Sequence, residues 1–236
     1  MVGMINKLGI VIIAGLALMA VTGLAVSENN GSSKAEASKV IKLPEPRTEG
    51  SISVEKALKE RRSIRSFGKD CLTLDEVSQL LWAAQGVTDD KGHRTAPSAM
   101  ARYPLQVYLL AGNITGLPSG VYHYSPQGHN LSVIMQSKID EYCNATAGFE
   151  AWIKTAPAIF VITGDLSSMN QMPRQDLSRW VYIEAGAAAE NLLLQVVSLD
   201  LASTYTAGFN VNKTEELLGL PAGEMPIGVL PVGTKA

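Results

Sequence analysis

The stretch Trp180–Gly208, WVYIEAGAAAENLLLQVVSLDLASTYTAG, decides the fold. Its first part has a helical pattern, because the polar residues share one narrow stripe at 3.6 residues per turn: Glu184, Asn191, Gln195 and Ser198. Nearly all the others are aliphatic or small, which predicts a helix that is buried nearly all round. The small residues from Ala185 to Ala189 would let another backbone or a flat ligand approach closely.

The end of this stretch predicts a strand. Asp200 leads into the β-prone run Leu201–Thr206, which ends at Ala207 and Gly208. A glycine just beyond a buried strand can present backbone N–H groups to a ligand. A plain core helix followed by a strand explains the same residues, and the local sequence leaves both interpretations open.

Composition limits the classes of function. The 236 residues fit one domain plus a terminal segment, and a formal charge of −2 gives no electrostatic footprint for nucleic acid. Cys71 and Cys143 are the only cysteines, and no CxxC or His pair at metal spacing occurs, so we expect no metal site. The two cysteines could pair or remain buried thiols.

The N-terminus has the pattern of a targeting or anchoring segment. Lys7 precedes the largely apolar Leu8–Val26, and a polar run follows from Ser27. We therefore expect a signal peptide or membrane anchor over residues 1–27, a flexible linker over residues 28–50 and a folded domain over residues 51–236. This predicts an exported or membrane-anchored domain, with the side of the membrane left open.

The domain mixes helices and strands without the regular alternation of a doubly wound sheet. Ser53 and the box Thr73–Glu76 are expected to cap two helices, the second ending near Gly86. Further helices are expected over residues 138–147, 180–198 and 212–218, and strands over residues 106–111, 120–125, 130–134, 158–163 and 226–232. No GxGxxG after a strand, Walker, GxSxG or HExxH motif is present.

Two short segments are candidate ligand sites. Arg61, Arg62, Ser63 and Arg65 surround an expected helix end, where guanidinium and hydroxyl groups can bind phosphate. The segment Pro97-Ser98-Ala99 precedes a second proline, Pro104, and is rigid enough to lie flat against a ligand. Taken alone, the arginine cluster is more often an ordinary solvated helix end, and a simple helix-to-strand connection explains the second segment equally well.

Five motifs in order resemble the nitroreductase-like flavoproteins, and within them the SagB-type dehydrogenase branch. They are Arg61–Phe67, Ala96–Ala99 with Tyr103–Leu105, Leu117–Tyr124, Glu184–Gly186 with Glu190–Leu192, and Leu230–Gly233. The resemblance covers residues 51–236. It implies an α+β fold with a mainly antiparallel central sheet flanked by helices, an intertwined homodimer, and FMN bound non-covalently at the subunit interface.

The resemblance also implies roles for single residues. Arg61 and Ser63 would hold the FMN phosphate and ribityl chain, Arg62 would also bind the cofactor, and Arg65 would face the N1 and C2 edge of the ring. Pro97, Ser98 and Ala99 of the other subunit would line the ring. The N–H groups of Ala207 and Gly208 would meet N5 and O4. Lys235 would be a last phosphate contact, where relatives usually have arginine.

The implied function is an FMN-dependent oxidoreductase. Hydride would pass through flavin N5 from a donor such as NAD(P)H to a small electrophilic acceptor, and no side chain would have to act as nucleophile or strong base. One alternative is a peptide azoline dehydrogenase, although Met172 and Pro173 stand where azole-forming relatives carry a Lys-Tyr pair. Another is a membrane-tethered flavin-binding protein without turnover.

Overall fold

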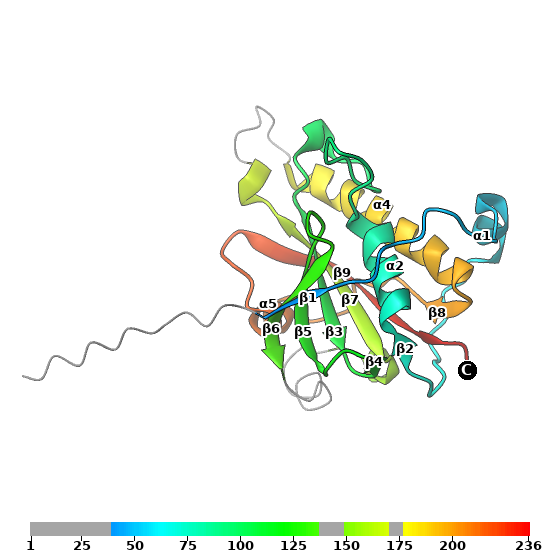
Figure 1. Ribbon diagram of the computed structural model, residues 1–236. Helices are drawn as coiled ribbons and strands as arrows, with labels where there is room; N and C mark the ends of the chain where they lie inside the picture. Colours follow the sequence, from blue (N-terminus) through cyan, green and yellow to red (C-terminus); the bar gives the residue numbers. More distant parts are fainter. Residues whose placement is uncertain (1–38, 137–148, 170–176) are drawn as a thin grey trace, which may run out of the picture. The chain divides into compact units, whose positions relative to one another are not determined.

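A seven-stranded antiparallel sheet forms the centre of the domain (Figure 1). The computed structural model describes residues 39–136, 149–169 and 177–236, which all belong to one compact unit. The strands follow the order β1-β6-β5-β3-β7-β9-β8. Their bounds are Val40–Lys42 (β1), Leu105–Ala111 (β3), Gly120–Ser125 (β5), Asn130–Gln136 (β6), Ala158–Asp165 (β7), Leu201–Ser203 (β8) and Glu224–Thr234 (β9). The mainly antiparallel sheet predicted from the sequence is confirmed.

Helices α2 (Leu74–Gln85) and α4 (Leu177–Ser198) cover one face of this sheet (Figure 1). Alternate residues of β3, such as Val107 and Leu109, pack against them, as the two-residue period of a strand requires. A side chain at Gly164 of β7 would collide with Val181 of α4, so this glycine permits the close contact between sheet and helix.

The opposite face carries a smaller apolar cluster. Tyr108 and Leu110 of β3 point to this side and pack with Leu217 of α5 (Val211–Leu218) and with Ile153 of a short 3-10 turn (Ile153–Thr155). A parallel pair of short strands, β2 (Leu72–Thr73) and β4 (Ile114–Thr115), completes the described architecture. Together these layers give the α+β fold that the sequence predicts.

The expected helix caps are present. Ser53 Oγ accepts from Lys56 N at 3.2 Å at the start of α1 (Val54–Glu60), and Thr73 and Glu76 form the reciprocal capping box of α2. Helix α5 begins at Val211, with Asn210 as its cap, rather than at Asn212, and it ends at Gly219 in the left-handed region (φ 62°).

The segment before α1 departs from the expected flexible linker. Residues 40–50, which we call the belt, lie against the domain. Strand β1 pairs with β6, and Leu43 is only 2% exposed. Pro44 O accepts from Ser78 Oγ at 2.6 Å. The Arg47 backbone exchanges two hydrogen bonds with the Gln79 amide, of 2.8 and 3.0 Å. Main-chain bonds with distant residues therefore hold a segment whose composition is typical of a linker.

Several predictions fall outside the described residues. They concern the N-terminal segment before residue 39, the helix over residues 138–147 with Cys143, and Met172 with Pro173. Cys71 is exposed, and its Sγ lies 3.0 Å from Thr115 Oγ1. Among the helices that the structure describes, none combines the length and apolar character needed to cross a bilayer.

Candidate functional site

Three of the residues expected to bind FMN line one small pocket of about 90 Å³. Arg61 and Arg62 come from the end of α1, and Lys235 follows β9. Ser203, the last residue of β8, lines the same pocket. We call this the cation pocket. The fold thus brings together charges that are about 170 residues apart in the sequence.

Carboxylates already contact two of these cations. Arg61 Nε lies 3.6 Å from Glu190 Oε1 of α4, and Lys235 Nζ pairs with Asp200 Oδ1. Arg62 Nη1 donates to the carbonyl oxygens of Lys59 and Arg61, at 2.9 and 2.7 Å. These contacts fix the directions of the cations, but an anionic ligand would have to compete with Glu190 and Asp200 for them.

Buried hydroxyl groups lie at the same end of the sheet. Ser203 Oγ, Thr204 Oγ1 and Thr234 Oγ1 are inaccessible to solvent, and none has a hydrogen-bond partner among the described residues. Unpartnered buried hydroxyls are uncommon, because desolvation is costly without a hydrogen bond. Ser203 lines the same pocket as the three cations, and a hydroxyl together with cations is a donor set that fits an anion such as a phosphate.

Backbone contacts tie the arginine motif to β8 and β9. Ile64 N donates to Ser203 O, and Gly68 N donates to Thr234 O, both at 2.9 Å. A side chain at Gly68 would collide with Thr234, so only glycine allows this approach. Ser63, which directly precedes Ile64, is exposed and does not line the cation pocket.

Arg65 and Gly208 each lie beside one member of a hydrogen-bonded pair, Trp152 and Glu150. The Arg65 guanidinium lies 5.6 Å from the centroid of the Trp152 ring, a cation–π arrangement. Trp152 Nε1 donates to Glu150 Oε2 at 2.6 Å, and Glu150 Oε1 lies 3.2 Å from the position that a Gly208 Cβ would take. Sequence reasoning flagged neither Glu150 nor Trp152. No short motif includes them, so only their position identifies them.

Ala207 and Gly208 are exposed, as a ligand-binding backbone requires. The N–H of Gly208 donates to Thr206 Oγ1 at 3.0 Å, and Phe209 N donates to Ala207 O at 3.1 Å. These bonds hold the turn after β8 in one shape.

Pro97, Ser98 and Ala99 line a different pocket, of about 390 Å³, and none of them lines the cation pocket of the same chain. The opposite wall comes from α4, with Trp180, Ile183, Glu184 and Ala187. Glu184 is 5% exposed, and burial raises the pKa of its carboxyl group. Its Oε1 accepts from Ala99 N at 2.6 Å.

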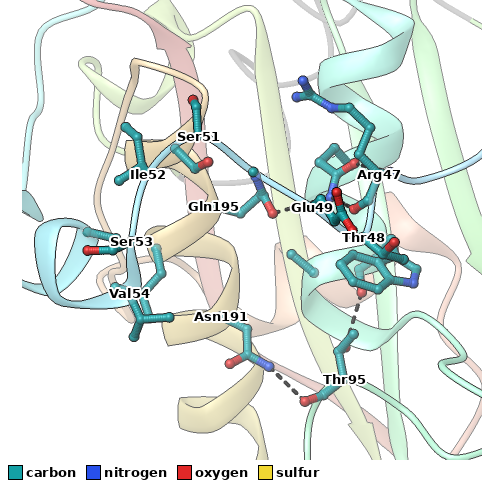
Figure 2. Close-up of a pocket in the computed structure, with 17 residues that line it drawn as sticks. Arg47, Thr48, Glu49, Ser51, Ile52, Ser53, Val54, Thr95, Asn191 and Gln195 are labelled. Carbon is teal, nitrogen blue, oxygen red and sulfur yellow. Dashed lines mark hydrogen bonds between the residues drawn. The ribbon is translucent and has the colours of Figure 1, made fainter.

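A third pocket, of about 400 Å³, lies between the belt, α2 and α4 (Figure 2). Asn191 Nδ2 donates to Thr95 O at 3.1 Å, and Gln195 Oε1 accepts from Gln79 Nε2 at 3.3 Å. The polar stripe of α4 is thus used to hold neighbouring segments. None of the residues predicted to bind a cofactor lines this pocket.

Comparisons with known proteins identify the family. A model described as the nitroreductase family matches residues 58–234. A protein of Methanocaldococcus jannaschii named as a nitroreductase is 34% identical over 184 residues, which are 78% of this chain and 92% of the relative.

Solved structures agree. A nitroreductase-named structure from Ralstonia eutropha has a TM-score of 0.74 and 32% identity, and the match covers 84% of this chain and 90% of that one. The Escherichia coli microcin synthetase McbBCD complex, with truncated pro-MccB17 bound, has a TM-score of 0.65 at 21% identity, over 91% of this chain and 85% of that one. The second match shows a shared fold alone. The chain therefore belongs to the nitroreductase family of oxidoreductases.

Proposed function

We propose that the protein is an FMN-dependent oxidoreductase that works as a homodimer. The cation pocket is the observation that supports this most directly, because Arg61, Arg62 and Lys235 meet there beside the unpartnered hydroxyl of Ser203. When bound, FMN would supply a hydride-accepting N5 atom, so the protein would not need a nucleophile of its own. The task of the chain is to bind and orient the cofactor.

The described contacts support separate roles along one cofactor. Arg61, Arg62 and Lys235 would hold the phosphate, with Ser203 as an added donor. Arg65, held over Trp152, would place positive charge at the N1 and C2 edge of the ring and stabilise negative charge there. In the exposed turn, the N–H of Ala207 would orient the opposite edge, and the N–H of Gly208 could do so only by exchanging its present acceptor, Thr206 Oγ1.

A second copy of the chain would complete the site. Pro97–Ala99 lie apart from the cation pocket of their own chain, which is consistent with their lining the ring in the partner's site. Apolar side chains beside them are exposed, namely Met100 (70%), Tyr182 (47%) and Ile183 (63%). A side chain at Gly186 would meet no described atom within 4 Å, so this face of α4 leaves room for close contact with another helix.

NAD(P)H is the electron donor that we propose, with a quinone, a nitro compound or a related electrophile as acceptor. A structure from Parabacteroides distasonis with the same fold (TM-score 0.53, 20% identity) carries the name NADH dehydrogenase/NAD(P)H nitroreductase. We also propose that residues 1–27 export or anchor the domain. Protease treatment of intact cells would test this, because an outward-facing domain would be cut and an inward-facing one protected.

A peptide azoline dehydrogenase, as in the SagB-type branch, is the second candidate. It is raised by the fold that the chain shares with a protein of the microcin synthetase complex, over 91% of this chain, a match that shows the fold and no activity. Met172 and Pro173, at the position of the Lys-Tyr pair of azole-forming relatives, argue against it.

Anaerobic mixing of the FMN-loaded protein with NADPH, NADH or dithionite tests the proposal. We expect either nicotinamide to bleach the flavin absorbance, and a quinone or nitroaromatic compound to restore it. Bleaching of the oxidised flavin by a thiazoline peptide, which would itself be oxidised to the thiazole, would favour the second candidate. Bleaching by dithionite but by neither nicotinamide would exclude the donor proposed here and favour a flavin-binding protein without turnover.

A further inference from the structure

Glu184 is a buried carboxylate whose only described hydrogen-bond partners lie in one loop. It sits near the middle of α4, is 5% exposed and forms no ion pair with any described residue. Its Oε1 accepts from Ala99 N at 2.6 Å, and Ser98 also hydrogen-bonds to this carboxylate. Burying a charge that has only neutral partners costs free energy. The segment that Glu184 holds in place can explain why a carboxylate is buried there.

The loop that Glu184 holds has an unfavourable backbone shape. Met100, Ala101 and Tyr103 have φ values of 52°, 54° and 49°, in the left-handed region that residues other than glycine rarely adopt. Local contacts maintain this shape. Tyr103 N donates to Ser98 Oγ at 2.7 Å, and the Arg94 guanidinium lies 4.7 Å from the centroid of the Tyr103 ring. Ser98 thus links the strained part of the loop to Glu184.

We propose that Glu184 is a positioning residue of the cofactor site, whose carboxylate holds Pro97–Ala99 in the shape that lines the FMN ring. This inference rests on the proposed function, which places Pro97–Ala99 against the ring. The loop is joined to α4 through Glu184, and α4 is packed against the sheet. Without the carboxylate, Ala99 N would lose its acceptor and the loop could relax toward ordinary backbone angles.

Glutamine and alanine at position 184 should differ in how much of the arrangement they keep. A glutamine can still accept from Ala99 N through its amide oxygen, but it faces Ser98 with an NH₂ group instead of an acceptor. Glu184→Gln should therefore keep part of the arrangement, and Glu184→Ala should lose it. Glu224 provides a matched control. It is also buried (9% exposed), with a pKa raised by burial, but it bonds to Thr163 on β7, away from all the predicted cofactor residues.

Two measurements on the purified full chain test this inference. The first is the dissociation constant of FMN, from quenching of flavin fluorescence. We expect Glu184→Ala to raise it about 10- to 100-fold, Glu184→Gln to raise it about threefold, and Glu224→Gln to change it by less than about twofold. The second is the rate of tryptic cleavage after the exposed Arg102 in FMN-free protein, followed by mass spectrometry. Glu184→Ala should accelerate this cleavage several-fold relative to wild type and to Glu224→Gln.

The outcomes separate the inference from the proposed function. If the wild-type chain binds no FMN, the proposed function fails and this inference fails with it. If the wild type binds FMN and Glu184→Ala binds it equally well, the inference alone is overturned, whether or not cleavage at Arg102 accelerates. If Glu184→Ala does not fold, the nearly isosteric Glu184→Gln decides: an FMN dissociation constant unchanged from wild type would overturn the inference.

Discussion

Replacing Ser203 with alanine should have opposite effects on the FMN-free and the FMN-bound protein. Ser203 is 1% exposed, and its Oγ has no hydrogen-bond partner among the described residues. A buried hydroxyl without a partner costs about 1–3 kcal/mol, and alanine removes that cost together with a single atom. We therefore expect Ser203→Ala to stabilise the FMN-free protein by about 1 kcal/mol or more, which raises Tm by about 2–4 °C for a domain of this size.

The same change should weaken FMN binding. If Ser203 donates to the phosphate in the cation pocket, it makes a hydrogen bond to a charged group, worth about 1.5–3 kcal/mol. Its loss corresponds to a rise of about 10- to 100-fold in the dissociation constant of FMN. At the same FMN concentration, the cofactor should then raise the Tm of the wild type more than that of the variant, because stabilisation by a ligand depends on its affinity.

Thermal unfolding with and without FMN, together with fluorescence titration, measures both effects. Ser78→Ala is the matched control, because Ser78 is equally buried but donates to Pro44 O at 2.6 Å and contacts His129 Nε2 at 2.7 Å. It should lose about 1–3 kcal/mol of stability and leave FMN affinity unchanged. The reasoning is refuted if Ser203→Ala destabilises the FMN-free protein as much as Ser78→Ala does, or if it binds FMN like the wild type.

Three further predictions concern stability. Burial raises the pKa of the Glu224 carboxyl group, so its contribution to stability is complete below pH 4.5 and is lost as pH rises through the folded-state pKa. In urea unfolding, the stability of Glu224→Gln relative to that of the wild type should therefore increase between pH 4.5 and 8. A constant difference in stability over this range would contradict the prediction. Burial lowers the pKa of His129, whose Nε2 lies 2.9 Å from Pro44 O, so its contribution to stability is present above pH 6.5 and is lost as pH falls through the folded-state pKa. In urea unfolding, His129→Gln should therefore lose less stability than the wild type between pH 8 and pH 5. An equal loss of stability would exclude His129 as its source. Gly164→Ala should lose about 1–3 kcal/mol in the same assay, because the new methyl group would overlap Val181; wild-type stability would show that α4 can shift.

Local signals in the sequence predicted most of the fold. The capping box Thr73–Glu76, the β5–β6 hairpin and the apolar run at Ala158 each specify a structure through neighbouring residues, and the structure confirms them. Helix α4 was expected to be buried nearly all round, but a single chain leaves Tyr182 and Ile183 exposed. A periodicity in the sequence shows that a face is apolar, and it does not show whether the same chain or a partner covers it.

The belt could not be predicted, because its stability comes from distant residues. Val40–Lys42 is too short to show a strand pattern, and its partner strand β6 begins 88 residues after Lys42, at Asn130. Leu43 lies among prolines and charged residues typical of a linker, although the fold buries it. Pairing at this range depends on the sheet already being formed.

The charged residues of the candidate site could be identified from the sequence, but most of their spatial arrangement could not. The arginine motif and Lys235 were identifiable from the sequence, whereas Ser203, Glu150 and Trp152 were not, because they belong to no short pattern. Glu184 did carry a signal, as the first polar residue of the stripe on an otherwise apolar helix. Its partner, the backbone of Ala99, is visible only in the structure.

The most direct test of the central claim is the visible absorbance spectrum of the purified chain after incubation with FMN and removal of unbound cofactor by gel filtration. We expect flavin bands corresponding to about one FMN per chain, in a peak of dimer size, and their near-complete loss in an Arg61→Ala, Lys235→Ala double variant that still folds. A colourless wild-type protein, or a double variant that retains as much flavin as the wild type, would contradict the account.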